Sequence, residues 1–233
     1  MNSVEAPDAL QAWQAGVEKL LANNGELTNL ITAIENPCLS DDEWLTTRSP
    51  NRYAAKGDDI RDVINTIFPV KLAHNAKSRS DLFSMYLKRH DRTHRWKSGR
   101  HAWGTYFERL IRFPPTGINQ LDRVIQKLCA WKTRNTTGLV FHLSSPVVDA
   151  PRTRGGPCWH YGELLWNADG TLDLVAVYRN HDFFNKALGN FIGLGQLLAF
   201  ICQQSEKKPG KLICHSVHAY HDGGVQALRR MAA

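Results

Sequence analysis

One of the five cysteines stands in a setting that could expose its sulfur. Residues 154–165 read RGGPCWHYGELL, so Cys158 directly follows Gly-Gly-Pro, a combination that favours a tight turn. Two interpretations are open. Cys158 is either a small apolar residue inside that turn or a thiol placed to react. The choice depends on which side chains the fold gathers around it.

Three later segments combine polar side chains with an apolar background. They read YRNHD, ALGNFIG and CHSVHAYHD, at residues 178–182, 187–193 and 214–222. The second places Asn190 in a predicted apolar helix. In the third, strand alternation would put Ser216, His218 and Tyr220 on one face. Taken singly, each of these residues fits an ordinary structural role.

Together and in this order, the segments resemble the thymidylate synthase family, which includes the deoxycytidylate and cytidylate hydroxymethylases. The resemblance is specific over about residues 154–222, and residues 1–100 form a divergent, mainly helical part. Pro157-Cys158 matches the pair that carries the family's nucleophile. Arg179 and Asn180 match its phosphate-binding strand, and Asn190 matches the side chain that binds the pyrimidine edge.

The resemblance implies further roles. His218 and Tyr220 match the family's His-x-Tyr strand, which binds the sugar 3′-hydroxyl. Tyr106, in Gly104-Thr105-Tyr106, matches an active-site tyrosine more loosely. Asp182 matches the aspartate that contacts the pterin of 5,10-methylenetetrahydrofolate, so that folate is the implied cofactor.

Such residues suit chemistry at the pyrimidine C5 atom. A thiolate from Cys158 adding to C6 would turn the ring into an enolate, whose C5 can attack a one-carbon donor. Arg179 would stabilise the thiolate and bind a phosphate. Asn190 would stabilise charge on the ring carbonyl. The resemblance favours uracil over cytosine, because family members that act on cytosine commonly carry aspartate at this position, although an amide can flip and serve either ring.

The sequence also departs from the family pattern. Two threonines stand at 136–137 in place of a phosphate-clamping arginine pair, and Arg134, Arg152 or Arg154 could compensate. Trp159 replaces a histidine after the nucleophile. Asp62 is the candidate for the catalytic carboxylate. The sequence ends at Ala233, where typical members continue into a tail that closes over folate, so we expect poor exclusion of water during one-carbon transfer.

Composition limits the class of protein. The 233 residues are 42% hydrophobic and 22% charged, as in soluble globular proteins, and contain no run of about 18 apolar residues. The acidic N-terminus does not resemble a secretory signal, so we expect a cytoplasmic protein without a membrane anchor. The net charge of +7 suggests an anionic partner, and a solvated surface alone also explains it. Residues 88–101 (KRHDRTHRWKSGRH) suit phosphate or RNA, and a solvated loop or helix end explains them equally well. The cysteines lack C-x-x-C spacing, so no metal site is expected.

The hydrophobic pattern predicts a single α+β domain over residues 1–233, and the resemblance makes it thymidylate-synthase-like, with a mostly antiparallel or mixed sheet covered by helices. Residues 38–56 are expected to be irregular, and a short helix is expected after Gly223-Gly224. The predicted helices are 9–21, 58–67, 80–88, 118–131 and 183–203, and the predicted strands are 139–143, 161–166, 172–178 and 211–220.

The resulting hypothesis is a pyrimidine nucleotide C5 methyltransferase or hydroxymethyltransferase, homodimeric by resemblance. Two alternatives remain open. One is a pyrimidine-nucleotide or RNA binding protein without folate chemistry. The other is thiol addition at C6 without a one-carbon donor. Ribose or deoxyribose, and the identity of the product, stay open.

Overall fold

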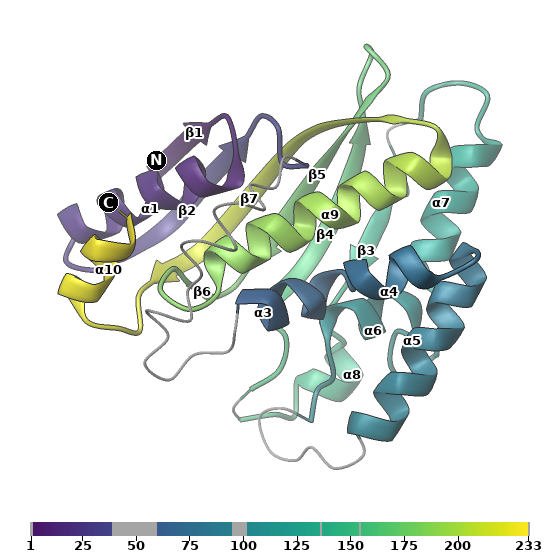
Figure 1. Cartoon of the computed structure of the whole chain (residues 1–233), viewed down its shortest axis with the longest axis horizontal. Coiled ribbons are helices and arrows are strands. Elements are labelled where there is room, and N and C mark those ends of the chain that lie inside the picture. Colours follow the sequence, from purple (N-terminus) through teal and green to yellow (C-terminus); the bar gives the residue numbers. More distant parts are fainter. Residues whose placement is uncertain (1, 39–59, 95–101, 136, 154, 233) are drawn as a thin grey trace.

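The computed structural model describes residues 2–38, 60–94, 102–135, 137–153 and 155–232. It is an α+β structure in which an open, mixed sheet is covered on one face by helices (Figure 1). This agrees with the predicted fold class. The expected irregular segment 38–56 lies almost wholly outside the described residues.

The described sheet has seven strands. Their order is β1 (Asn2–Ala6), β2 (Glu26–Ile34), β7 (Lys208–Tyr220), β5 (Thr171–Tyr178), β4 (Trp159–Trp166) and β3 (Val140–His142), and β6 (His181–Asp182) pairs with the end of β7. The pairs β2–β7, β3–β4 and β4–β5 are antiparallel, whereas β1–β2, β5–β7 and β6–β7 are parallel. Among the described strands, parallel pairs are therefore as frequent as antiparallel ones.

Helix α9 (Ala187–Ser205) is the central covering element, and it crosses β7 and β5 in Figure 1. Its glycines permit a close approach by α3 (Ile60–Ile67). A Cβ at Gly189 would lie 2.8 Å from the Val63 Cβ, and one at Gly193 would lie 3.0 Å from the Ile67 Cβ. Helix α1 (Ala9–Ala22) packs beside α9 and covers β1 and β2.

The remaining described helices are short or lie at the periphery. They are α4 (Val70–Asn75), α5 (Arg79–His94), α6 (Tyr106–Ile111), α7 (Gln120–Ala130), α8 (Pro146–Asp149) and α10 (Val225–Ala232). The predicted helices, hairpin and last strand are all present with shifted ends. Strands β1 and β2 and helices α4, α6 and α8 were not predicted. No helix in the described ranges is long and apolar enough to span a membrane.

A two-residue break separates β5 from β6 and shifts the burial pattern of β7. Tyr178 pairs with Ser216, and the next pair on the same side is His181 with Ala219. In the break, the Arg179 carbonyl oxygen accepts a hydrogen bond from the His218 backbone N–H at 3.2 Å. As a result Ser216 and Ala219 are both fully buried, so simple alternation fails here.

A buried ion pair fixes the chain that leads to Cys158. Arg109 on α6 makes two hydrogen bonds to Asp149 at the end of α8, at 2.5 and 2.9 Å, and the two side chains are only 2% and 8% exposed. Arg109 also donates to the carbonyl oxygens of Leu143 and Trp103, and Asp149 accepts the Ser145 backbone N–H. Every side of this pair therefore has a polar partner, which is the condition for a tolerable buried charge.

We expect Asp149→Asn to lower the free energy of unfolding at pH 7 by about 3 kcal/mol or more, because it leaves the buried Arg109 charge uncompensated. Burial opposes ionisation of Asp149, but Arg109 and the Ser145 N–H outweigh it and hold the pKa of Asp149 below the ordinary value of 3.8. The unfolded chain thus takes up this proton at a higher pH than the folded one. The stabilisation is present above about pH 4 and is lost as the pH falls through the folded-state pKa.

Urea unfolding from pH 7 to pH 3 measures this. The difference between wild type and Asp149→Asn should shrink on acidification. The exposed Asp62 provides the control, because Asp62→Asn should change stability little at any pH. A difference that stays constant down to pH 3 would contradict the assignment.

Candidate active site

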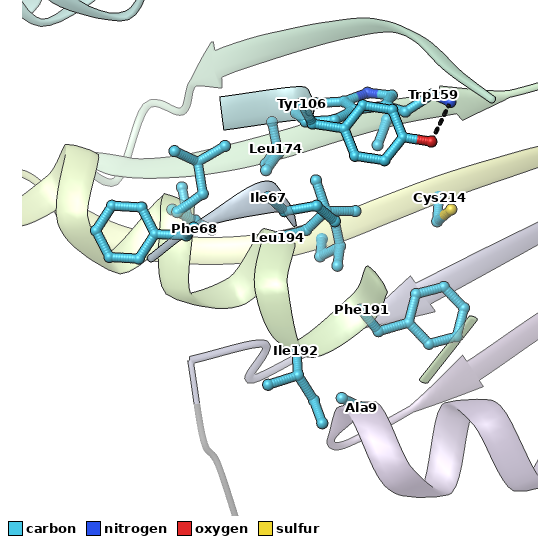
Figure 2. Close-up of a cluster of buried hydrophobic side chains, with 14 of the residues drawn as sticks. Ala9, Ile67, Phe68, Tyr106, Trp159, Leu174, Phe191, Ile192, Leu194 and Cys214 are labelled. Atoms are coloured by element: carbon cyan, nitrogen blue, oxygen red, sulfur yellow. Dashed lines mark hydrogen bonds between the residues drawn. The ribbon is translucent and has the colours of Figure 1, made fainter. Parts of the chain in front are cut away.

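The Tyr106 phenol holds the backbone at the cysteine. The backbone N–H groups of Cys158 and Trp159 both donate to its oxygen, at 3.1 and 3.2 Å, and Figure 2 shows the bond to Trp159. Tyr106 is the first residue of α6, whose N-cap Thr105 accepts the Glu108 N–H. Burial and then the charge of the Cys158 thiolate raise the pKa of Tyr106, so phenol and sulfur are electrostatic neighbours. Cys158 itself is half-buried at the start of β4.

Two arginine side chains lie at the glycines before Cys158. Arg179 donates through Nη2 to the Gly155 carbonyl oxygen at 2.7 Å, and its own backbone N–H donates to the Cys158 carbonyl oxygen at 2.9 Å. A Cβ at Gly156 would lie 3.8 Å from Nη2 of Arg179 and 3.9 Å from Cδ of Arg152. Neighbouring His160 senses the same charge: burial and then Arg179 lower its pKa. The turn therefore combines a half-buried thiol with a guanidinium group bonded to its backbone.

His218 and Tyr220 lie at the end of β7, next to this turn. Their rings stack at a centroid distance of 5.3 Å. Nδ1 of His218 lies 3.0 Å from the Asn180 Oδ1, and its Nε2 lies 3.2 Å from a Glu26 carboxylate oxygen. Burial, followed by the charges of Asp182 and Cys158, raises the pKa of Tyr220. The two predicted sugar-binding residues thus lie within reach of the predicted nucleophile.

The Asp182 carboxylate organises the loop after β6. One oxygen accepts the backbone N–H groups of Phe184, Asn185 and Asp222, at 2.9, 3.2 and 3.3 Å. The other accepts the Asn185 side-chain amide at 2.7 Å. The structure therefore gives Asp182 a clear structural role, and its predicted contact with a pterin stays a prediction.

Asn190 is 4% exposed at the start of α9 and contacts a buried histidine. Its Nδ2 lies 3.1 Å from Nε2 of His181, and Nδ1 of His181 lies 2.8 Å from the Ser216 Oγ. Burial lowers the pKa of His181 to about 3, so the imidazole is neutral at physiological pH.

A series of aromatic rings connects this polar group to the cysteine turn. The Trp159 and Tyr178 rings are nearly parallel at 6.4 Å, and Tyr178 stacks on His181 at 4.3 Å with an interplanar angle of 7°. The Tyr178 hydroxyl has no hydrogen-bond partner among the described residues. Burial and then the charges of Tyr106, Cys214 and Cys158 raise its pKa. Tyr178 therefore lies between the thiol and the Asn190 amide.

The structure thus brings together seven of the predicted site residues: Tyr106, Cys158, Arg179, Asn180, Asp182, His218 and Tyr220. Asn190 joins them through the ring series. Tyr178, His181 and Ser216 were missed as site residues. The sequence signal was the segment YRNHD at residues 178–182, in which every side chain carries a polar group although a buried strand end requires none.

The other candidates fall into three groups. Asp62 is exposed on α3, and no described contact assigns it to the thiol. Arg134 donates to the Trp166 carbonyl oxygen, at the opposite end of β4 from the cysteine, which eight strand residues place roughly 26 Å away. Arg154 and residues 95–101 lie outside the described chain, and Lys88, Arg89 and Arg92 are exposed on α5.

No protein-family model matches this chain. Two curated archaeal proteins are similar to it, and each is named "Putative thymidylate synthase". The protein of Methanococcoides burtonii is 24% identical over 169 residues, which cover 71% of this chain and 75% of that protein. The protein of Methanosarcina barkeri is 29% identical over 116 residues, so that match spans about half of each chain.

Both matches support a distant thymidylate-synthase-like relationship. This agrees with the family that the motifs resemble. At these identities the relationship does not extend to a specific reaction, which has to be argued from the site.

We expect Tyr106→Phe to lower the free energy of unfolding by about 1–3 kcal/mol, because it removes the acceptor of two backbone N–H groups and leaves them unpaired. Without this anchor the turn should adopt several conformations. Alkylation of Cys158 by a thiol reagent should then no longer follow a single rate. Chemical denaturation and mass-resolved alkylation measure the two effects. Tyr161→Phe is the matched control, because its hydroxyl binds only the Glu163 carboxylate among the described residues. Equal effects of the two substitutions would argue against a special role for Tyr106.

Proposed function

We propose that this protein adds the Cys158 thiolate to C6 of a pyrimidine nucleotide and transfers a one-carbon unit, methyl or hydroxymethyl, to C5. The observation that carries the proposal is the position of the thiol. Cys158 is half-buried at a turn whose backbone is bonded by Tyr106 and by the Arg179 guanidinium, with the Arg152 side chain at the neighbouring Gly156. A structural cysteine needs none of these neighbours.

The chemistry follows from these groups. The sulfur forms a bond to C6, and the electron pair of the C5–C6 double bond moves onto C5 and the ring carbonyl. The buried Asn190 amide would hydrogen-bond this carbonyl and stabilise its charge. C5 then takes up an electrophile and loses its original proton, and elimination of the thiolate restores the ring. Tyr178 and Trp159 would keep water from the base with their rings.

The anion of the nucleotide would lie at the rim of the site. Arg179 is exposed there, and Arg152 reaches the same glycine from the chain segment held by Asp149. Two guanidinium groups can bind a phosphate through paired, charge-assisted hydrogen bonds. Arg152 thus supplies a second positive charge in a chain that lacks the arginine pair at 136–137. His218 and Tyr220 would bind the sugar hydroxyl.

When bound, 5,10-methylenetetrahydrofolate would supply a one-carbon unit at the oxidation level of formaldehyde, which becomes hydroxymethyl by adding water or methyl by taking a hydride from the folate. The residue that would contact its pterin is Asp182. Three backbone N–H groups occupy one of its oxygens, whereas the other has one described partner and a further lone pair for a pterin N–H. The residue therefore fits a folate contact, with its orientation already fixed.

A homodimer is part of the proposal. On the helix-covered face, the side chains of β5 are fully buried. On the opposite face, side chains of β2, β4, β5 and β7 are half-buried or exposed, although several are apolar: Ile31, Leu165, Val175, Val177 and Ile213. A second copy packed sheet against sheet would cover this face.

The primary test is exchange of the C5 hydrogen in deuterated water, read by mass spectrometry. Uridine and cytidine monophosphates of both sugar types are the substrates, with and without the folate. Reversible addition of Cys158 should exchange the hydrogen, and a mass gain of a methyl or hydroxymethyl group with folate would name the product. Cys158→Ser should abolish both reactions, whereas Cys129→Ser, an exposed thiol, should change neither.

Exchange that survives in Cys158→Ser would overturn the mechanism. Saturable binding of a nucleotide without any exchange would make the site a receptor rather than an enzyme. Affinity for RNA alone, with a steep salt dependence, would instead support RNA binding by the basic surface of α5.

We also expect Arg152→Ala to weaken the affinity for a nucleoside monophosphate about tenfold and to leave the affinity for the nucleoside nearly unchanged, because one charge-assisted hydrogen bond to phosphate is lost. Titration calorimetry measures both. Arg134→Ala is the matched control and should change neither affinity. Equal weakening of nucleotide and nucleoside by Arg152→Ala would show a structural effect instead.

A further inference from the structure

The hydrogen bonds around His181 define its protonation. The imidazole is neutral because its pKa is lowered to about 3, so one ring nitrogen carries a proton and the other accepts. Nε2 lies 3.1 Å from the Asn190 Nδ2, which can only donate. With the Asn190 Nδ2 on this side, Nε2 is the acceptor, and Nδ1 then carries the proton and donates to the Ser216 Oγ at 2.8 Å.

Packing prevents the His181 ring from turning. Tyr178 stacks on one face at 4.3 Å, and Phe183 and Phe191 meet the ring edge-on at 5.3 and 5.4 Å. The side chain is 1% exposed. Beyond Ser216 lies the Cys214 thiol; burial raises the pKa of this thiol to about 12, and the hydrogen bond of the Ser216 hydroxyl offsets only part of that rise. A series of hydrogen-bonding groups therefore runs inside the core from Asn190 through His181 and Ser216 to Cys214.

The orientation of the Asn190 amide is linked to this tautomer of His181, in which Nδ1 carries the proton. A flipped amide would direct its carbonyl oxygen at the unprotonated Nε2, and two acceptors would then oppose each other in a buried place. The amide thus keeps one N–H on His181. Its carbonyl oxygen and its second N–H then remain for a ligand, with the acceptor and the donor in defined positions.

Uracil and cytosine differ in this order. Along the edge formed by position 4 and N3, uracil offers an acceptor and then a donor, whereas cytosine offers a donor and then an acceptor. An amide that can flip would serve either base, but one that is held can serve only one. We infer that His181 is a positioning residue that holds the Asn190 amide in one orientation and so makes the site selective for the uracil ring over the cytosine ring, an inference that rests on the proposed function.

Two substitutions test this. His181→Phe keeps a flat ring for stacking on Tyr178 but removes both nitrogens, and His181→Gln restores an acceptor near the place of Nε2. His215→Phe is the matched control, since this half-buried histidine lies on β7 and bonds Asn29. The readout is the ratio of affinities for uridine and cytidine monophosphates, measured by calorimetry on one preparation, so that the folded fraction cancels.

Wild type and His215→Phe should prefer uridylate. His181→Phe should lower the uridylate-to-cytidylate ratio roughly tenfold, and His181→Gln should restore most of it. An unchanged ratio in His181→Phe, with both affinities lowered together, would assign His181 a merely structural role and overturn the inference. Equal affinity of the wild type for uridylate and cytidylate would also overturn the inference, and the proposed thiol chemistry would still stand.

A second measurement does not depend on nucleotide. In protein labelled with ¹⁵N-histidine, the ring nitrogens of His181 should show a neutral imidazole with the proton on Nδ1 at pH 7, assigned by comparison with His181→Phe. A proton on Nε2, or a charged ring, would overturn the inference even if uridylate reacts. If no pyrimidine nucleotide binds at all while this tautomer is observed, the proposed function falls, and base selectivity falls with it.

Discussion

The buried pair of Arg109 and Asp149 is the constraint on which the site depends. Arg109 lies three residues after Tyr106 on α6, so the ion pair that fixes the guanidinium also fixes the phenol that holds the cysteine turn. Asp149 precedes the turn in the chain. Its carboxylate lies 3.7 Å from the Nε of Arg152, three residues later. One carboxylate therefore sets the positions of both a buried structural arginine and a candidate phosphate ligand.

The break between β5 and β6 is the second constraint. Two residues, Arg179 and Asn180, leave the ladder and reach the rim, and the chain then re-enters the sheet with His181 pointing into the core. A continuous strand would have alternated these side chains between the two faces. The break instead gives one short segment an exposed cation and a buried imidazole that both serve the same site.

The sequence was sufficient for elements with a strong local signal. The hairpin of β4 and β5 follows from alternation around Asn167-Ala168-Asp169-Gly170, and α9 follows from its long apolar run. Helix α6 has only six residues, too few for a periodic pattern, and β1 depends on parallel pairing with β2, which no local rule specifies. The order of motifs predicted Cys158 and Asn190 as site residues, and these assignments stay predictions. Choosing Arg152 over Arg134, and finding His181, required the tertiary contacts.

The site separates its polar groups by depth, and this separation bears on the choice among ligands. Arg179, Asn180 and His218 lie at the rim, where a charged group can keep part of its hydration. The Asn190 amide, His181 and Ser216 lie in the core, where an unmatched hydrogen bond is costly. A polyanion such as RNA needs only the rim, so the buried group would be unexplained. A pyrimidine nucleotide has the same division within one molecule, with phosphate and sugar at one end and a hydrogen-bonding ring at the other. The deep amide therefore favours a ligand that inserts its base, as the proposed addition of the Cys158 thiolate to a pyrimidine ring requires.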